Sequence, residues 1–290
     1  MNAPTNYYTR LLGEASASGL SRFRESPLTY LDWTQNPTDN PTPPMREGTA
    51  FHMAIHEPER FARTYIEIPV MALRSREDKE EFLMEVFRVT GVPLIFEGEN
   101  AEDLRSKVVR ELKKTGAQVL TSESLATLRG MARSLNMGQH AEPRSIVARG
   151  KKEVEFRWKD GDSGLQCKAR LDSWDAELGI LSDLKRTAAI TARGFRREVL
   201  TRGYHFQMAF YRRALREAGE SPKYCCFTCG CPTGPLYPWA LYDLPEEVLD
   251  ACDEQLSRDL LSLAECVSKN DWPSLNGGKA TTLDIRSEYI

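Results

Sequence analysis

The sequence lacks long apolar runs, and its first residues lack an apolar core. Hydrophobic residues make up 41% of the 290 positions, but they occur in runs of only a few residues. A membrane-spanning helix needs roughly 18 in succession. The stretch 1–9 also lacks the central apolar segment of a signal peptide. We therefore expect a soluble, unexported protein of the cytoplasm with no membrane partner.

The cysteines do not have the pattern of a secreted disulfide framework. There are seven, an odd number, and four of them are Cys225, Cys226, Cys229 and Cys231. Disulfide-dense secreted domains are usually much shorter and carry an even number of cysteines. A reducing compartment fits better. The four crowded cysteines could hold zinc or an iron–sulfur cluster, but we expect them to be buried residues of a strand.

The net charge is small, yet it is unevenly distributed. The chain carries −3 overall with an estimated pI of 5.9. From Lys185 to Arg216, however, nine basic residues face a single acid, Glu198, so this segment carries +8 and the rest of the chain −11. A compact basic face in an acidic protein can bind a polyanion such as nucleic acid. A solvated helix face is the alternative.

The hydrophobic periodicity predicts an α/β fold. Apolar residues spaced by three and four predict helices, whereas Val154, Phe156 and Trp158 alternate with charged residues, as in a half-buried strand. We expect helices at 16–26, 48–57, 76–90, 101–115, 122–136, 201–218 and 245–268. We expect strands at 154–158, 165–174, 179–185, 223–228 and 236–242, the first three forming a β-meander. The proline-rich stretch 36–44 is expected to be a loop. Residues 1–272 are expected to form one domain, followed by a loosely held tail, 273–290.

Charged residues with catalytic potential gather at the ends of two predicted strands. Asp172 ends one strand, and Asp183 and Lys185 end the next. Because side chains alternate along a strand, Asp183 and Lys185 share a face and Leu184 points to the other. A hairpin that places Asp172 beside Asp183 would create two repelling carboxylates, which Mg²⁺ commonly neutralises. The lysine could then orient a water or stabilise charge on a phosphate. An ordinary surface salt bridge remains the alternative.

The order of the motifs resembles that of the PD-(D/E)xK nuclease superfamily, and most closely its exonuclease VIII-type branch of phage and prophage recombination. The matching segments are, in chain order, Ser16–Leu20 with Ser26, Pro27 and Tyr30; Gly48–His52 with Glu57, Pro58 and Phe61; Lys168–Asp172; Asp183–Lys185 with Thr187; and Tyr204, Gln207 and Tyr211. Each segment is weakly specific alone, but their common order is specific. The sequence departs from the pattern at Leu171, where the superfamily has proline, and at Asp183, where the superfamily often has glutamate.

The resemblance implies a restriction-endonuclease-like core, a central mixed sheet flanked by helices. It implies that the metal ligands are His52, Asp172, Asp183 and the backbone carbonyl of Leu184, and that Lys185 is the catalytic lysine. It further implies that Gln207 and Tyr211 are catalytic residues that line the site and hold the scissile phosphate or the attacking water. Arg186 and Thr187 would contact DNA, although relatives commonly have threonine where this chain has Arg186.

The activity implied by the resemblance is Mg²⁺-dependent DNA hydrolysis, with Mn²⁺ as a substitute. Relatives of this type degrade one strand of linear duplex DNA from its 5′ end, leave 3′ single strands for an annealing protein, and form rings. We therefore expect a homo-oligomeric exonuclease. The alternatives are an endonuclease or single-strand nuclease of the same superfamily, and a catalytically silent DNA-binding protein.

The predicted helix 201–218 has an apolar stripe and a basic flank. At about 100° per residue, the stripe comprises Leu200, Tyr204, Gln207, Met208, Tyr211 and Leu215. Gln207 is thus an amide within an apolar face, and a buried amide needs a partner. The flank comprises Arg202, His205, Arg212, Arg213 and Arg216. These arginines could follow a phosphate backbone, or they could form a solvated flank.

Two other metal sites compete with this assignment. His52 and His56 lie four residues apart on a predicted helix, a spacing that can bind zinc. They lack the internal glutamate of a zinc protease motif, so we interpret His56 as an ordinary surface or packing residue. Some relatives hold an iron–sulfur cluster with one cysteine ahead of the nuclease core. Here the first cysteine, Cys167, lies inside the core, so that ligand is missing.

Overall fold

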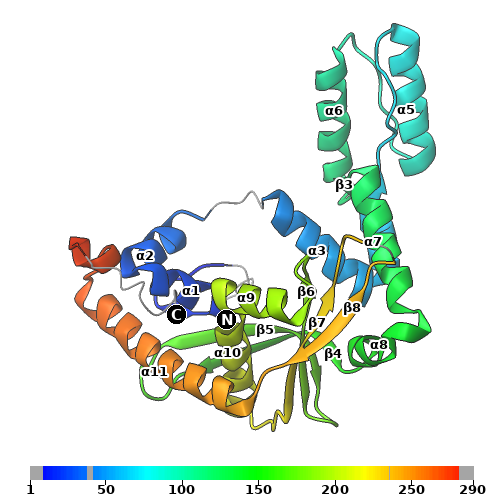
Figure 1. The fold of residues 1–290 in the computed structure, drawn as a ribbon. Coiled ribbons are helices and arrows are strands. Elements are labelled where there is room, and N and C mark those ends of the chain that lie inside the picture. Colours follow the sequence, from blue (N-terminus) through cyan, green and yellow to red (C-terminus); the bar gives the residue numbers. More distant parts are fainter. Residues whose placement is uncertain (1–8, 38–41, 235, 281–290) are drawn as a thin grey trace.

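The computed structural model describes residues 9–37, 42–234 and 236–280, and it is built around one mixed sheet (Figure 1). The six strands are β1 (Glu14–Ala15), β4 (Lys151–Lys159), β5 (Gln166–Asp175), β6 (Ile180–Arg186), β7 (Tyr224–Gly230) and β8 (Trp239–Asp243). Five follow the order β1-β5-β6-β7-β8, and β4 pairs with β5. The pairs β4–β5 and β5–β6 are antiparallel, as the predicted meander requires. The expected α/β class, a mixed sheet flanked by helices, is confirmed.

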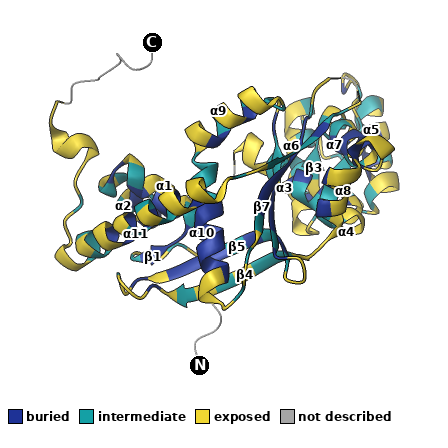
Figure 2. Ribbon diagram, turned by 60° about the horizontal axis from the view of Figure 1, so that its bottom comes forward, coloured by how far each residue is buried: buried dark blue, intermediate teal, exposed yellow. Residues whose placement is uncertain are grey.

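Helices cover both faces of the sheet. The helices α1 (Ala17–Glu25), α9 (Ala192–Arg202), α10 (Tyr204–Glu217) and α11 (Glu246–Lys269) contribute to one core, which includes Phe195, Phe210 and Phe227. In Figure 2, α10 is the helix buried at the centre of the molecule. The helices α3 (Pro43–His56), α4 (Pro58–Thr64) and α7 (Ser122–Leu135) contribute to the other core, which includes Phe51 and Leu184. Helix α8 (Ala141–Ala148) follows α7, and α2 (Pro27–Gln35) follows α1.

A helical hairpin projects from this body. Helices α5 (Arg76–Thr90) and α6 (Ala101–Lys114) connect two short parallel strands, β2 (Tyr65–Glu67) and β3 (Gln118–Leu120). Parallel strands require such a crossover, because the end of one and the start of the next lie at opposite ends of the pair. The two helices stand side by side away from the sheet (Figure 1) and enclose their own core, which contains Phe82, Leu104 and Leu112. The hairpin is therefore a separate packing unit.

Several boundaries differ from the sequence prediction. The expected helix 201–218 is two helices, because Gly203 adopts φ +70°, a left-handed conformation that ends α9. Leu200 thus leaves the predicted apolar stripe and is 58% exposed. Helix α3 begins at Pro43, within the expected loop, since proline is favoured in the first turn; residues 38–41 of that loop lie outside the described residues. The prediction also missed α2, α4, α8, β1, β2 and β3.

The expected tail is described only in part. Leu275–Gly278 form a 3₁₀ turn, and residues 281–290 lie outside the described residues. Within the described ranges, none of the helices combines the length and apolar character that a membrane crossing requires.

Candidate active site

A buried carboxylate and a largely buried one lie side by side on adjacent strands. Ser173 on β5 pairs with Ser182 on β6, so the next position in this register places Asp172 opposite Asp183. The Asp183 side chain is 1% exposed and that of Asp172 15% exposed. Asp172 Oδ2 accepts a hydrogen bond of 2.8 Å from the amide of Leu184. The hairpin predicted from the sequence is present, and the burial of Asp183 argues against an ordinary surface salt bridge.

The Asp183 carboxylate lacks the hydrogen bonds that a buried charge needs. Its Oδ2 lies 2.6 Å from Lys185 Nζ, an ion pair, while Oδ1 has no hydrogen-bond partner within the described ranges. Burial raises the pKa of Asp183 to about 6, against the lowering effect of Lys185. At Asp172 the desolvation that would raise the pKa is outweighed by His52, Lys185 and the Leu184 amide, so the pKa is lowered.

Lys185 is held between the carboxylates and helix α10. Its Nζ donates to Gln207 Oε1 at 3.1 Å and lies 4.3 Å from the ring centre of Tyr204. Burial lowers the pKa of Lys185, but the charges of Asp183 and Asp172 outweigh this effect and raise it. The lysine therefore remains a cation, which suits stabilisation of negative charge rather than removal of a proton.

The amide predicted within the apolar face of α10 is partnered on both sides. Gln207 accepts from Lys185 through Oε1 and donates through Nε2 to the hydroxyl of Tyr211 at 2.9 Å. Its polar atoms thus connect the lysine to the buried Tyr211. The side chain satisfies the need of a buried amide for partners and fixes the position of the lysine. This is the role of a positioning residue.

His52 reaches the site from the opposite side of the sheet. It lies on α3, whose Phe51 packs in the same core as Leu184. His52 Nδ1 lies 3.5 Å from Asp172 Oδ2. The structure thus brings together His52, Asp172, Asp183, Lys185, Gln207 and Tyr211, all predicted from the sequence. The role of the Leu184 carbonyl as a ligand stays a prediction.

This set of groups fits a hard divalent cation. Asp172 and Asp183 offer oxygen atoms, the ligands that Mg²⁺ prefers. A cation beside the buried pair would also provide the partner that Asp183 Oδ1 lacks. Two carboxylates so close together repel each other, and a bound cation removes that repulsion. The residues that would hold the ion are Asp172 and Asp183, with His52 beside them.

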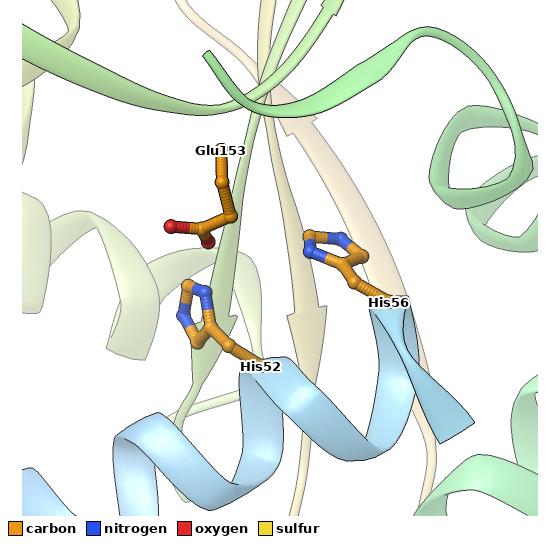
Figure 3. Close-up of side chains that lie close together, drawn as sticks. All are labelled: His52, His56 and Glu153. Carbon is orange, nitrogen blue, oxygen red and sulfur yellow. The ribbon is translucent and has the colours of Figure 1, made fainter. Parts of the chain in front are cut away.

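The structure adds an acid that the sequence analysis missed. Glu153 on β4, together with His52 and His56, offers ligand atoms that all lie within 4.8 Å of one another (Figure 3). The β4–β5 ladder pairs Lys152 with Ser173 and Val154 with Leu171, so Glu153 lies on β4 between these pairs, beside the part of β5 that carries Asp172. The sequence offered one indication of this acid: Glu153 comes directly before Val154, the first of the alternating residues of the first meander strand.

The prediction that α10 has an exposed basic flank is wrong for Arg212 and Arg213. Both are buried, at 2% and 9% exposure. Arg212 Nη2 lies 2.6 Å from Asp250, and Arg213 Nε lies 2.7 Å from Asp253. Helix α11 packs on this side of α10 and supplies both acids. A buried guanidinium that is paired with carboxylates is unavailable to a phosphate backbone.

The remaining residues expected to contact DNA differ in accessibility. Arg202 and Arg216 have side chains that are 63% and 45% exposed. Arg186 forms an ion pair of 3.1 Å with Glu47 of α3. Thr187 is buried and its hydroxyl is hydrogen-bonded to Glu198 and to the amide of Ala189, so it ties the end of β6 to α9. Thr187 is therefore part of the local structure rather than an exposed contact.

An exposed basic surface lies instead on α9. Arg193, Arg196 and Arg197 are all exposed there. At the C-terminal end of this helix, a groove of about 570 Å³ runs between α1 and the junction of α9 and α10, and Arg22, Arg202, Tyr204 and Gln207 are among the residues that line it. Since Gln207 contacts Lys185, this groove leads to Lys185.

The crowded cysteines do not converge on one point. Cys225, Cys226 and Cys229 lie on β7, and Cys225 and Cys229 belong to the core beneath α10. Alternation along the strand directs Cys226 to the opposite face. Burial raises the pKa of Cys225 to about 11 and that of Cys226 to about 12. All four cysteines are buried, so the expectation of buried strand cysteines is confirmed for Cys225, Cys226 and Cys229, whereas Cys231 directly follows the strand.

Comparison with known proteins identifies the family. Residues 16–284 match a family described as a PDDEXK-like domain of unknown function (DUF3799). A solved structure from Eubacterium rectale, described as a "Putative exonuclease", is similar at 13% identity with a TM-score of 0.57, and the match covers 98% of this chain and 96% of that one. At this identity the similarity shows the fold alone.

No curated protein matches this chain. A second solved structure is less similar to it than the first. That structure is a phage-related exonuclease from Haemophilus somnus 129PT, at 14% identity with a TM-score of 0.32, covering 76% of this chain and 95% of that one; a similarity this weak carries no argument. The family match spans the segments that hold the two aspartates, the lysine and the Gln207 helix. The chain belongs to this PDDEXK-like family, and the resemblance to the PD-(D/E)xK nuclease superfamily is confirmed.

Proposed function

We propose that this protein is a Mg²⁺-dependent nuclease that hydrolyses phosphodiester bonds in DNA, with Mn²⁺ as a substitute. The observation that carries the proposal is the buried arrangement of Asp172, Asp183 and Lys185, with a carboxylate oxygen of Asp183 that has no hydrogen-bond partner in the described residues. A protein that had kept the fold only for binding would have no need for this buried and incompletely hydrogen-bonded carboxylate, which costs stability. The catalytically silent alternative is therefore disfavoured.

Each side chain has a role that follows from its position. Asp172, Asp183 and His52 would hold the cation, which when bound supplies Lewis-acid stabilisation and an activated water. Lys185, kept protonated by the two carboxylates, would stabilise negative charge on the phosphate. Gln207 and the buried Tyr211 would hold the lysine in position. The Leu184 carbonyl is proposed as a further ligand.

DNA is proposed to approach through the groove between α1 and the α9–α10 junction. The groove ends beside Gln207 and Tyr204, which contact Lys185. Exposed arginines of α9, with Arg202 and Arg22, would neutralise phosphates along this path. Arg186 and Arg216 are proposed as peripheral contacts. Arg212 and Arg213 are left out because α11 covers them.

The finer activity is proposed from the resemblance to exonuclease VIII-type enzymes. We propose an exonuclease that degrades linear duplex DNA from 5′ ends and leaves 3′ single strands. A homo-oligomer, as in the ring-forming relatives, and a single-strand annealing partner belong to the same proposal. An endonuclease or single-strand nuclease is the alternative within this fold.

The test is a digestion of end-labelled linear duplex beside a covalently closed circle of the same sequence. With Mg²⁺ the parent should degrade the linear DNA, and labels at either end report polarity. Lys185→Met and Asp183→Asn should reduce the rate at least about a hundredfold, whereas Lys223→Met, an exposed lysine at the far end of β7, should not. Cleavage by Lys185→Met at the parental rate would refute the site, and cutting of the circle would favour the endonuclease.

A further inference from the structure

A nitrogen-rich group of ligands lies beside the carboxylate pair and has no role in the proposed reaction apart from sharing His52. It comprises His52, His56 and Glu153, whose ligand atoms lie within 4.8 Å of one another, and Figure 3 shows the Glu153 carboxylate and both rings directed toward a common space. Two imidazoles and one carboxylate are the ligand types of zinc and other borderline transition metals. Mg²⁺, by contrast, prefers oxygen ligands.

The backbone presents these three side chains from two elements. His52 and His56 are four residues apart in α3, so they lie on the same face one turn apart. Glu153 lies on β4 with φ +52°, a left-handed conformation that is uncommon for residues other than glycine. Such a conformation persists only where the surroundings enforce it, and it is found preferentially at functional sites. This conformation turns the Glu153 side chain away from the direction that a regular strand would give it.

One ring nitrogen of His56 is buried without a hydrogen-bond partner among the described residues. The atom is Nδ1, which is inaccessible to solvent. An imidazole nitrogen without a partner is costly to bury, and a bound metal would remove that cost. A pocket of about 350 Å³, lined in part by His56, Ala148 and Lys152, opens beside His56. An ion could reach His56 without passing through the DNA groove.

The groups around the three ligands also have to be compatible with an ion. Arg170 lies 3.0 Å from Glu153 Oε2, and metal-binding carboxylates commonly have such an outer partner that orients them. Lys152 adds positive charge nearby, which opposes a cation. Its ammonium is, however, engaged by Ser173 Oγ at 2.8 Å and by the carbonyl of Arg149. The negative charge of Asp172, which lies beside His52, further offsets the positive charge of Lys152.

We propose that His52, His56 and Glu153 form a second metal site, selective for zinc-like transition metals and distinct from the magnesium site at Asp172 and Asp183. Bonds of about 2.0–2.1 Å to such an ion require the three side chains to close slightly around it, with water completing the coordination. Because His52 also borders Asp172, an ion held here draws that imidazole away from the magnesium site. Zinc at this site is therefore inhibitory, a consequence that rests on the proposed nuclease function, whereas the binding itself does not.

The test measures metal binding without DNA, so it is independent of nuclease activity. Purified full-length protein is stripped with chelator and titrated with Zn²⁺ by calorimetry, and with Co²⁺ by visible absorption. The parent and Asp183→Asn should each bind one ion, with the Co²⁺ absorption of a site containing nitrogen ligands. His56→Ala and Glu153→Gln should each weaken binding by about a hundredfold or more, since loss of a ligand exceeds the 10–100-fold cost of losing an outer partner. His205→Ala, which removes a histidine elsewhere, should bind as the parent does.

Three results would overturn the proposal. The first is no stoichiometric Zn²⁺ binding by the parent, and the second is binding that survives in both His56→Ala and Glu153→Gln. The third is binding that Asp183→Asn abolishes while His56→Ala retains it, which would place the ion at the aspartates. Melting curves in chelator establish that each variant is folded. Failure of the proposed nuclease function would appear separately, as absence of Mg²⁺-dependent cleavage by the stripped parent.

Discussion

At the scale of single residues, the two aspartates share one site but differ in their acidity. Burial raises the pKa of Asp183 to about 6, whereas His52, Lys185 and the Leu184 amide keep the pKa of Asp172 low despite burial. In the metal-free protein, Asp183 therefore contributes stability at low pH that is lost as pH rises through about 6. Asp172 contributes in the opposite sense, with stability that is lost as pH falls.

The first prediction at this scale concerns pH. A metal ion needs Asp183 as a carboxylate, so protons compete with it below about pH 6. The increase in melting temperature caused by Mg²⁺ should accordingly be small near about pH 5 and should rise to a plateau by about pH 7.5. Melting curves with Mg²⁺ and with chelator measure it. Asp183→Asn should show no such rise, and an equal Mg²⁺ effect at both pH values in the parent would contradict the assignment.

A second prediction separates a buried arginine from an exposed one on the same helix. Arg213 is paired with Asp253 at 2.7 Å and bonded to Ser257 at 2.7 Å, whereas Arg216 is 45% exposed with acids no closer than 3.9 Å. Removing one partner of a buried pair leaves the other charge unsatisfied, at about 3–5 kcal/mol. Exposed pairs contribute less than about 1 kcal/mol.

Chemical denaturation of Arg213→Met and Arg216→Met therefore should show a large loss of unfolding free energy for the first variant and almost none for the second. Equal losses would mean that α11 does not cover Arg213 in solution.

At the scale of elements, the sequence predicted what local patterns can show. The strands β4, β5 and β6 were predicted because alternation and turn residues are local signals, and Asp183 with Lys185 followed from that alternation. The burial of Arg212 could not be predicted from one helical wheel, because Asp250 lies 38 positions further along the chain. Glu153 was missed because its neighbours in the site come from α3, about a hundred residues earlier.

The next prediction tests α9 as the phosphate-binding element. Arg193, Arg196 and Arg197 are exposed on α9, whose last residues line the groove, and each phosphate contact releases condensed counterions. Replacing all three with alanine should reduce the slope of log affinity against log salt on duplex DNA by as much as about 2 to 3 units. The rate at saturating DNA should change much less, since these side chains do not reach Lys185.

The matched control removes three basic residues from the projecting hairpin, Arg110, Lys113 and Lys114 of α6, which are also surface residues. Their replacement changes the net charge equally but lies away from the groove. DNA binding should keep its salt slope in this control. A reduced slope in the control, with no change in the α9 variant, would place the DNA on the hairpin.

At the scale of the whole molecule, the described residues pack into three hydrophobic cores, two of which are in contact through the sheet. Two lie on the faces of the sheet and meet through it, with Leu181 in one and Leu184 in the other. The third belongs to α5 and α6 and includes no residue of the six-stranded sheet. Elements that share a core unfold together, whereas elements with a separate core can unfold locally while the rest stays folded. Figure 1 shows the hairpin attached to the body only at its base.

The last prediction follows from that separation. Leu112 of α6 and Leu256 of α11 are both fully buried, at 0% and 1% exposure, in the hairpin core and the body core. Each leucine-to-alanine change creates a cavity that costs about 2–5 kcal/mol, so the pair is matched in chemistry. Native-state hydrogen exchange on Leu112→Ala should lose protection in α5 and α6 while the amides of β5, β6 and β7 keep theirs, and Mg²⁺-dependent cleavage should persist. Leu256→Ala should lose protection across the sheet. If Leu112→Ala lowered protection equally in the sheet, hairpin and body would form one cooperative unit, and the hairpin could not move independently of the active site.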